Sequence, residues 1–337
     1  MRRFFNAVAA ATLGLFAGSA AAQDYPWKPD RPVTLIVPWA AGGSTDQMAR
    51  IVATELESEL KQKVVVVNQP GASGSVGTKG VLEGAKDGYT WAAGAAVDIG
   101  GYKVLGLLDS QLKDWNLFFA VANVNTVAAN PSAPFKDFGQ FLETLKKNGK
   151  DVPVATAGLS SAGHNMMETI RKSAPGVEYR HVTYDGGNPA VLSAVSGETQ
   201  AAAQLLVEMS EFIKGKRLIP LAVQADKPVV LDGYGEIPPV TKWLPNMPAP
   251  LNYFGIWAPK GTPEPVVQTM DMIWKKKIAN SEPLKKYAAA RAALFTPLSG
   301  EEAAREAMKM VTQTVWLYFD AGKAKASPDT IGIARPQ

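Results

Sequence analysis

The chain has 337 residues, with 35 Lys and Arg against 31 Asp and Glu, and it contains no cysteine. Disulfides, thiolate metal sites and cysteine nucleophiles are therefore excluded. The net charge of +4 is small and dispersed, and the largest cluster, Lys275-Lys276-Lys277, fits a solvated helix face, so nothing indicates a nucleic-acid partner. The length is sufficient for two domains.

The N-terminus has the three regions of a secretory signal peptide. Arg2 and Arg3 precede an apolar stretch from Phe4 to Ala17, and small residues follow up to Ala22. We expect cleavage after Ala22 and export of a soluble protein to the periplasm. An uncleaved membrane anchor is the alternative, but the apolar stretch is short for a spanning helix.

Residues 33–46 predict a strand, a glycine loop and the start of a helix. An apolar, β-branched run ends at Pro38, and Gly42-Gly43 leads into an amphipathic pattern that starts at Ser44 or Thr45. The first N–H groups of a helix have no intrahelical partner, so this junction can bind an anion. Asp46 could accept hydrogen bonds from a ligand, or it could only cap the helix in an ordinary loop.

A second glycine-rich loop follows in the first half of the chain. Residues 64–67 are four valines, which suits a strand buried on both faces of a parallel sheet. The loop at 68–77 leads into a helix that ends near Ala85, and residues 89–93 predict a third strand. This β-α-β-α-β order gathers the loops at one sheet edge, where open α/β sheets bind ligands. Residues 96–116 have no clear pattern.

An apolar run at 117–127 predicts a strand that crosses into a second domain, where the same order starts again. The further predicted elements are helices at 135–147, from His164 and at 190–195, strands at 152–157, 177–183, 218–223 and 253–258, and late helices from Thr262-Pro263-Glu264 and from Ser299-Gly300. Pro189 would take the first position of the helix at 190–195. Two more loops rich in glycine and hydroxyl residues, 158–163 and 184–189, complete a set of four. The proline-rich segment 237–250 predicts the return to the first domain.

The sequence offers little catalytic chemistry. There is no Gly-x-Ser-x-Gly elbow and no phosphate-binding Gly-x-x-x-x-Gly-Lys-Ser/Thr. The two histidines have no acidic cluster at metal-ligand spacing, so we expect no metal and no cofactor. His181 lies within a predicted strand and is expected to be structural, whereas His164 follows a loop and could reach the cleft wall. A hydrolase using Ser161 and His164 stays open as an alternative, although nothing marks an orienting acid for it.

Eight short sequence blocks lie in a characteristic order along nearly the whole chain after the predicted signal peptide. They lie at 31–34, 41–46, 68–77, 87–90, 160–164, 181–190, 221–223 and 258–263. On these residues the chain resembles the Bug family of periplasmic solute-binding proteins, the extracytoplasmic receptors of tripartite tricarboxylate transporters. The resemblance implies an α/β chain with the type II periplasmic-binding-protein fold, in which two α/β domains enclose a ligand cleft. Residues 23–123 and 251–337 would form domain 1, and residues 124–250 would form domain 2.

The resemblance and the four loops together nominate the ligand-binding residues. They are Trp39, Gly42, Gly43, Ser44, Asp46, Ala96, Asp98, Ser160, Ser161, His164, Tyr184, Gly186, Gly187 and Pro189. Near Asp98 the family commonly has a small hydroxyl residue. An acid there would disfavour a second ligand carboxylate and favour an amine or a hydroxyl.

The resemblance also implies a function without catalysis. We expect a monomeric receptor that captures a small organic carboxylate and delivers it to the integral-membrane permease subunits of a tripartite tricarboxylate-type transporter. A periplasmic sensor that presents the ligand to a signalling protein is the second hypothesis. The sequence does not separate these two, and it does not indicate which carboxylate is bound.

Overall fold

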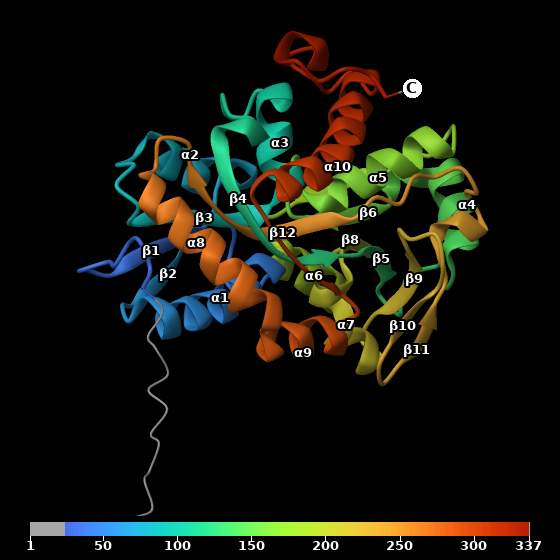
Figure 1. The fold of residues 1–337 in the computed structure, drawn as a ribbon. Coiled ribbons are helices and arrows are strands. Elements are labelled where there is room, and N and C mark those ends of the chain that lie inside the picture. The colour runs from blue at the N-terminus through green and yellow to red at the C-terminus, as the bar shows by residue number, and fades with distance from the viewer. Residues whose placement is uncertain (1–23, 337) are drawn as a thin grey trace, which may run out of the picture.

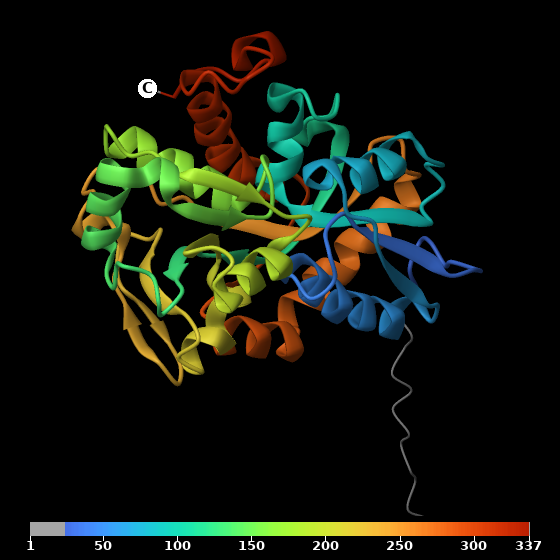
Figure 2. The same cartoon turned by 180° about the vertical axis from the view of Figure 1, so that it is seen from behind.

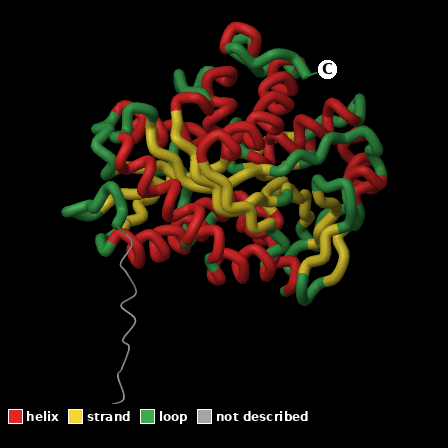
Figure 3. Tube along the Cα trace, viewed as in Figure 1, coloured by secondary structure: helices red, strands yellow, loops and turns green. Residues whose placement is uncertain are grey.

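Strands lie at the centre of the molecule and helices cover them (Figure 3). The structure is a computed structural model that describes residues 24–336, so the predicted signal peptide at 1–22 lies outside the described residues. Views from the front and from behind show two α/β domains next to one another (Figures 1 and 2). Each domain has its own sheet.

The first domain contains a six-stranded sheet in the order β13-β4-β12-β3-β1-β2. Its strands are β1 (Val33–Val37), β2 (Val64–Asn68), β3 (Thr90–Ala95), β4 (Trp115–Asn123), β12 (Asn252–Pro259) and β13 (Leu294–Ser299). Its helices are α1 (Ser44–Leu60), α2 (Ser75–Glu83), α3 (Ala96–Leu105), α8 (Glu264–Lys276), α9 (Glu282–Ala290) and α10 (Gly300–Asp320). β1 pairs in parallel with both β2 and β3, which confirms the predicted β-α-β-α-β unit.

The second domain contains a five-stranded sheet in the order β7-β6-β8-β5-β9. Its strands are β5 (Asn125–Ala129), β6 (Pro153–Thr156), β7 (Arg180–Thr183), β8 (Ala201–Leu205) and β9 (Ile219–Val223), with a separate hairpin of β10 (Val229–Leu231) and β11 (Gly235–Ile237). Its helices are α4 (Phe138–Asn148), α5 (Ala162–Ser173), α6 (Gly187–Ser196) and α7 (Leu206–Lys214).

Three sequence predictions are wrong in detail. β2 is the edge strand of its sheet, so Val65 is 47% exposed and the four valines are not buried on both faces. α6 begins at Gly187, which places Pro189 at its third position. α8 begins at Glu264, two residues after the predicted start at Thr262, whose hydroxyl donates to the carbonyl of Pro259.

The chain passes between the two sheets in adjoining strands. β4 ends at Asn123 and β5 begins at Asn125, so the single crossing strand predicted at 117–127 is two strands in two different sheets. β12 then pairs antiparallel with β3 and β4 and returns the chain to the first sheet. α10 packs against α3 of the first domain and α5 of the second (Figure 1).

Each sheet is buried in its own apolar core. Leu35, Met48 and Trp274 are fully buried in the first domain, and Phe138 and Met166 are fully buried in the second. Four second-domain residues at the boundary, Ala157, Ala162, Leu205 and Val207, also pack into the core of the first domain. Domains that are joined by only a few crossing segments can move relative to one another. The loops at the carboxyl ends of the parallel strands face each other across the boundary between the domains.

Candidate functional site

Five helices begin at one small cavity between the two domains. The cavity measures ≈ 30 Å³ and is lined at the helix starts by Ser44 of α1, Ala95 before α3, Ala162 of α5, Gly187 of α6 and Leu205 before α7. The N-terminus of each helix contributes unpaired N–H groups and partial positive charge. Their convergence makes the backbone around this cavity electropositive, and helices of both domains contribute to it.

Six of the predicted site residues line this cavity: Trp39, Gly43, Ser44, Asp98, Ser161 and Gly187. The eight other predicted site residues do not line it: Gly42, Asp46, Ala96, Ser160, His164, Tyr184, Gly186 and Pro189. The lining also includes residues that were not predicted, namely Thr45, Ala95, Ala157, Ala162, Gln204, Leu205, Glu208 and Phe254.

Glu208 is the most consequential residue that the sequence reasoning missed. Its Oε1 accepts a 2.8 Å hydrogen bond from the backbone N–H of Ser44, although the two residues belong to different domains. It is the third residue of α7 and also accepts from the N–H of Leu205, as an acid at this position commonly does. Burial raises the pKa of Glu208, while the hydrogen bonds from Ser44 and Leu205 oppose that rise. The carboxylate therefore bridges the N-termini of α1 and α7.

Gly187 gives the Glu208 carboxylate its space. A β-carbon at Gly187 would overlap both carboxylate oxygens, and one at Gly43 would lie 3.3 Å from Oε1. The absence of side chains at these two helix starts lets the acid approach the backbone directly. Backbone amides of the site thus hold a carboxylate that belongs to the protein itself.

Asp98 places a second acid at the same cavity. It is 4% exposed, and its Oδ1 has no hydrogen-bond partner within the described residues. Burial raises the pKa of Asp98 to about 8, against the opposing effect of hydrogen bonds from the N–H of Ala95 and the indole of Trp39. Asp98 is the third residue of α3, so it occupies the same helical position as Glu208 does in α7.

Asp46 has a structural role in the first loop. Its carboxylate accepts hydrogen bonds from the N–H of Gly42 at 2.9 Å, from Arg50 at 2.8 and 3.1 Å and from the amide of Asn68 at 3.0 Å. Burial alone would raise the pKa of Asp46, but these bonds together lower it. Asp46 therefore fixes the loop that carries Gly42, and its oxygens already have partners in the first domain.

Several further hydrogen bonds join the loops of the two domains. The N–H of Ala40 donates to the carbonyl of Asp185 at 2.9 Å, and a β-carbon at Gly186 would lie only 2.9 Å from that nitrogen. On the other side, the N–H of Leu159 donates to Ser73 Oγ and the hydroxyl of Ser160 donates to the Ser73 carbonyl, both at 2.9 Å. The cleft is therefore in a closed arrangement, and Ser160 and Gly186 contribute to the closure.

His164 lies behind the cavity wall and does not form a dyad with Ser161. The backbone N–H of His164 donates to Ser161 Oγ at 3.3 Å, but the ring nitrogens lie near Tyr179 and Lys323. The ring stacks on His181 with centroids 4.4 Å apart. Burial, followed by the neighbouring His181 and cations, holds the pKa of His164 well below its usual value. This geometry does not fit a Ser161–His164 hydrolase.

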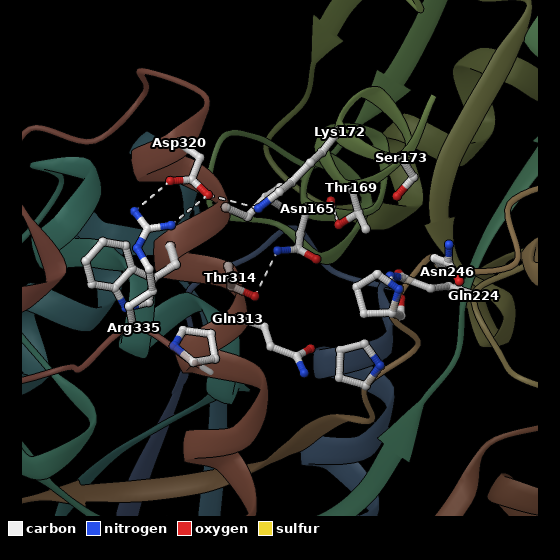
Figure 4. A pocket seen from close by; sticks show the side chains of 15 residues that line it. Asn165, Thr169, Lys172, Ser173, Gln224, Asn246, Gln313, Thr314, Asp320 and Arg335 are labelled. Carbon is white, nitrogen blue, oxygen red and sulfur yellow. Dashed lines mark hydrogen bonds and ion pairs between the residues drawn. The ribbon is translucent and has the colours of Figure 1, made fainter. Parts of the chain in front are cut away.

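A larger cavity of ≈ 430 Å³ lies between α5, α10 and the segment around Pro248. Figure 4 shows Asp320 between Lys172 and Arg335 at one end and Asn165 reaching toward Thr314 in the middle. Asn165 donates to Thr314 Oγ1 at 2.9 Å, so these polar groups are already paired with each other. None of the predicted site residues lines this cavity.

Within residues 24–336, no group of three or more His, Asp or Glu is placed to hold a metal ion. No helix in the same part of the chain is both long and apolar enough to cross a membrane. The site therefore consists of amides, hydroxyls and two acids.

Comparison with solved structures identifies the fold. The periplasmic binding protein BugD superposes with a TM-score of 0.80 at 24% identity, covering 88% of this chain and 100% of BugD. An R. palustris protein solved with adipate superposes with a TM-score of 0.78 at 22% identity, covering 87% of this chain and 98% of that one. The fold is that of a periplasmic binding protein, with two α/β domains and a ligand cleft between them.

The sequence comparison identifies the family. Residues 48–314 match the family described as the tripartite tricarboxylate transporter family receptor, TctC. BugT of Bordetella pertussis is 30% identical over 272 residues, which cover 76% of this chain and 80% of BugT. The chain belongs to this receptor family, and the resemblance to Bug proteins is confirmed.

Proposed function

We propose that this protein is a periplasmic receptor that captures a small organic carboxylate between its domains and delivers it to a tripartite tricarboxylate-type transporter in the membrane. The observation that carries the proposal is the Glu208 carboxylate at the N-termini of α1 and α7, against Gly187 of α6. A site that accommodates one carboxylate by backbone amides is suited to anions. Adipate in the R. palustris neighbour supports a carboxylate as ligand.

Capture requires the domains to separate. A cavity of ≈ 30 Å³ has about the volume of one water molecule, so a solute could enter only when the loops move apart. The adjoining strands β4 and β5, where the chain crosses between the sheets, would serve as the hinge for this movement. A ligand that contacts both domains would then favour the closed arrangement. In this proposal the protein is exported, acts as a monomer and catalyses no reaction.

A thermal-shift panel tests the proposal. Residues 23–337 are mixed separately with dicarboxylates, tricarboxylates, aromatic carboxylates and acidic amino acids. A ligand at about 100 times its Kd should stabilise the folded protein by roughly 2.7 kcal/mol. We expect one chemical class to respond. The double variant Asp46→Ala/Gly43→Val should lose that response, and full retention would contradict this placement of the site.

Transport requires a further test, in which deletion of the permease genes abolishes uptake of the responding compound.

A further inference from the structure

Three polar atoms at the interdomain cavity have no hydrogen-bond partner within the described residues. They are Asp98 Oδ1, Glu208 Oε2 and Gln204 Nε2. Asp98 is 4% exposed and Gln204 is 2% exposed, so neither can satisfy these atoms with bulk solvent. An unsatisfied buried polar group costs roughly 1–3 kcal/mol, and natural proteins contain few of them. Three such atoms at one cavity therefore indicate that a ligand supplies their hydrogen-bond partners.

The ionisable side chains around the cavity are all acids. Asp98 and Glu208 both line it, whereas no Lys, Arg or His is among the lining residues that the structure describes. Each acid has one side engaged at its own helix start, through the N–H of Ala95 or of Leu205, and the other oxygen is unpartnered. Without a ligand, burial keeps Asp98 protonated near neutral pH, and a cation or N–H donor placed between the two acids would stabilise their ionised forms.

We propose that the ligand carries a basic nitrogen, an ammonium or a similar cation, which binds between Glu208 and Asp98, while its acceptor group faces Gln204. This inference rests on the proposed receptor function and narrows its substrate class to amino-bearing carboxylates. A positively charged nitrogen satisfies both free carboxylate oxygens, and an oxygen of the ligand carboxylate accepts from Gln204 Nε2. The helix starts at Ser161 and Gly187 lie at the same cavity and add N–H groups for that carboxylate.

The alternative for Glu208 is that it only holds the domains together. In that case it would occupy the anion position permanently, and a ligand carboxylate would have to displace it. The two alternatives differ in the expected effect of removing its charge. If Glu208 binds a ligand cation, Glu208→Gln weakens binding. If Glu208 only competes with a ligand carboxylate, Glu208→Gln strengthens binding.

The test uses equilibrium dialysis of residues 23–337 against a defined mixture of small molecules, read by mass spectrometry. The mixture contains straight-chain dicarboxylates of four to six carbons, ω-amino acids and α-amino acids of the same lengths, and the corresponding diamines. We expect an amino-bearing carboxylate to be retained at least tenfold more than the dicarboxylate of equal length. Each retained compound is then titrated calorimetrically against the variants.

Glu208→Gln and Asp98→Asn should each weaken binding of the retained compound at least tenfold, with unchanged far-ultraviolet circular dichroism. Glu211→Gln is the matched control, because Glu211 lies on the same helix with a side chain that is 63% exposed and pairs with Lys214. It should change binding less than twofold. Asp98→Asn keeps the test decisive if Glu208→Gln does not fold.

Three outcomes overturn the inference. Retention of dicarboxylates over their amino-bearing counterparts would contradict the substrate class but leave the receptor function standing. Equal or tighter binding by both neutralised variants would show that the acids do not contact a ligand cation. Retention of no compound, in the mixture and in the carboxylate panel, would count against the receptor function as well.

Discussion

The backbone N–H of Ser44 and the carboxylate of Glu208 join the two domains through a 2.8 Å hydrogen bond. Ser44 is the first residue of α1, and Glu208 lies in the first turn of α7. An N-terminal amide and an acid form a charge-assisted bond, which is stronger than a bond between neutral groups. This contact is one of several that hold the cleft closed, and Gly187 provides the space for its carboxylate.

Gly187→Ala should break this contact. Its methyl group would overlap the Glu208 carboxylate and displace it. We expect a loss of about 1–3 kcal/mol in the free energy of unfolding, because a charged hydrogen bond is lost and the acid is displaced from its amides. In a Glu208→Ala background the same change should cost less than about 0.5 kcal/mol. Chemical denaturation of the wild-type protein, the two single variants and the double variant gives the coupling energy between Gly187 and Glu208.

Gly80→Ala is the control for Gly187→Ala. Gly80 lies inside α2, and a β-carbon there would have no atom within 4 Å. It should therefore stabilise the protein slightly through helix propensity. Equal costs of Gly187→Ala with and without Glu208 would show that the clash is with the backbone and that the carboxylate is not its cause.

Asp98→Asn should stabilise the protein, and increasingly so at higher pH. The pKa of Asp98 is raised to about 8, so between pH 4 and pH 8 the folded state holds a proton that the unfolded state has released. The wild-type protein therefore loses stability from this group as pH rises through that window, whereas asparagine does not titrate. We expect the advantage of the variant to grow by about 1 kcal/mol per pH unit, since one proton corresponds to 1.36 kcal/mol per unit. Denaturation curves at pH 5, 6, 7 and 8 measure it, and a constant difference would contradict the raised pKa.

Asp46→Ala should destabilise the protein at neutral pH and much less in acid. The pKa of Asp46 is lowered, so its contribution is present above the pKa of an unfolded aspartate and is lost as pH falls through the folded value. Loss of the bonds to Gly42 and Arg50 should cost about 1–3 kcal/mol at pH 7. Asp109→Ala is a suitable control, because its side chain is 84% exposed. If Asp46→Ala lowers the free energy of unfolding as much at pH 3 as at pH 7, lost packing and not lost charge is the cause.

The stacked histidines should make the protein sensitive to mild acid. Burial, then Lys323, lowers the pKa of His181 to about 4, while Glu168 opposes this, and the pKa of His164 also lies well below its usual value. Below pH 6.5 the unfolded state binds protons that the folded state excludes, so stability falls as pH decreases toward 4. His181→Gln should reduce the slope between pH 6.5 and pH 4.5 by up to about 1.4 kcal/mol per unit. Unchanged slopes would mean that the ring already carries a proton in the folded protein.

The first half of the site was predictable because two different periodicities meet there. The β-branched run before Pro38 and the helical stripe after Ser44 define a junction, and Gly42-Gly43 marks the loop between them. Hydrophobic periodicity is the strongest local signal in a sequence. The structure places Gly43 and Ser44 at the cavity accordingly.

Glu208 was not predictable by the same reasoning. β8 is Ala201–Leu205, which has no β-branched residue, and α7 follows it without a glycine loop. A pattern of glycine-rich junctions therefore does not include the connection from β8 to α7. An acid three residues after Leu205 was the available signal, since acids are favoured in the first turn of a helix. Its contact with Ser44 depends on the closure of two domains, which no local pattern encodes.

The network around Asp46 orders the first-domain loop before a solute arrives. Gly42, Arg50 and Asn68 all bind Asp46 from within the first domain, so this loop keeps its shape whether or not the second domain is near. The conformational entropy of ordering it is lost during folding and need not be lost again at each encounter with a solute. The first domain thus presents a preorganised loop to a solute.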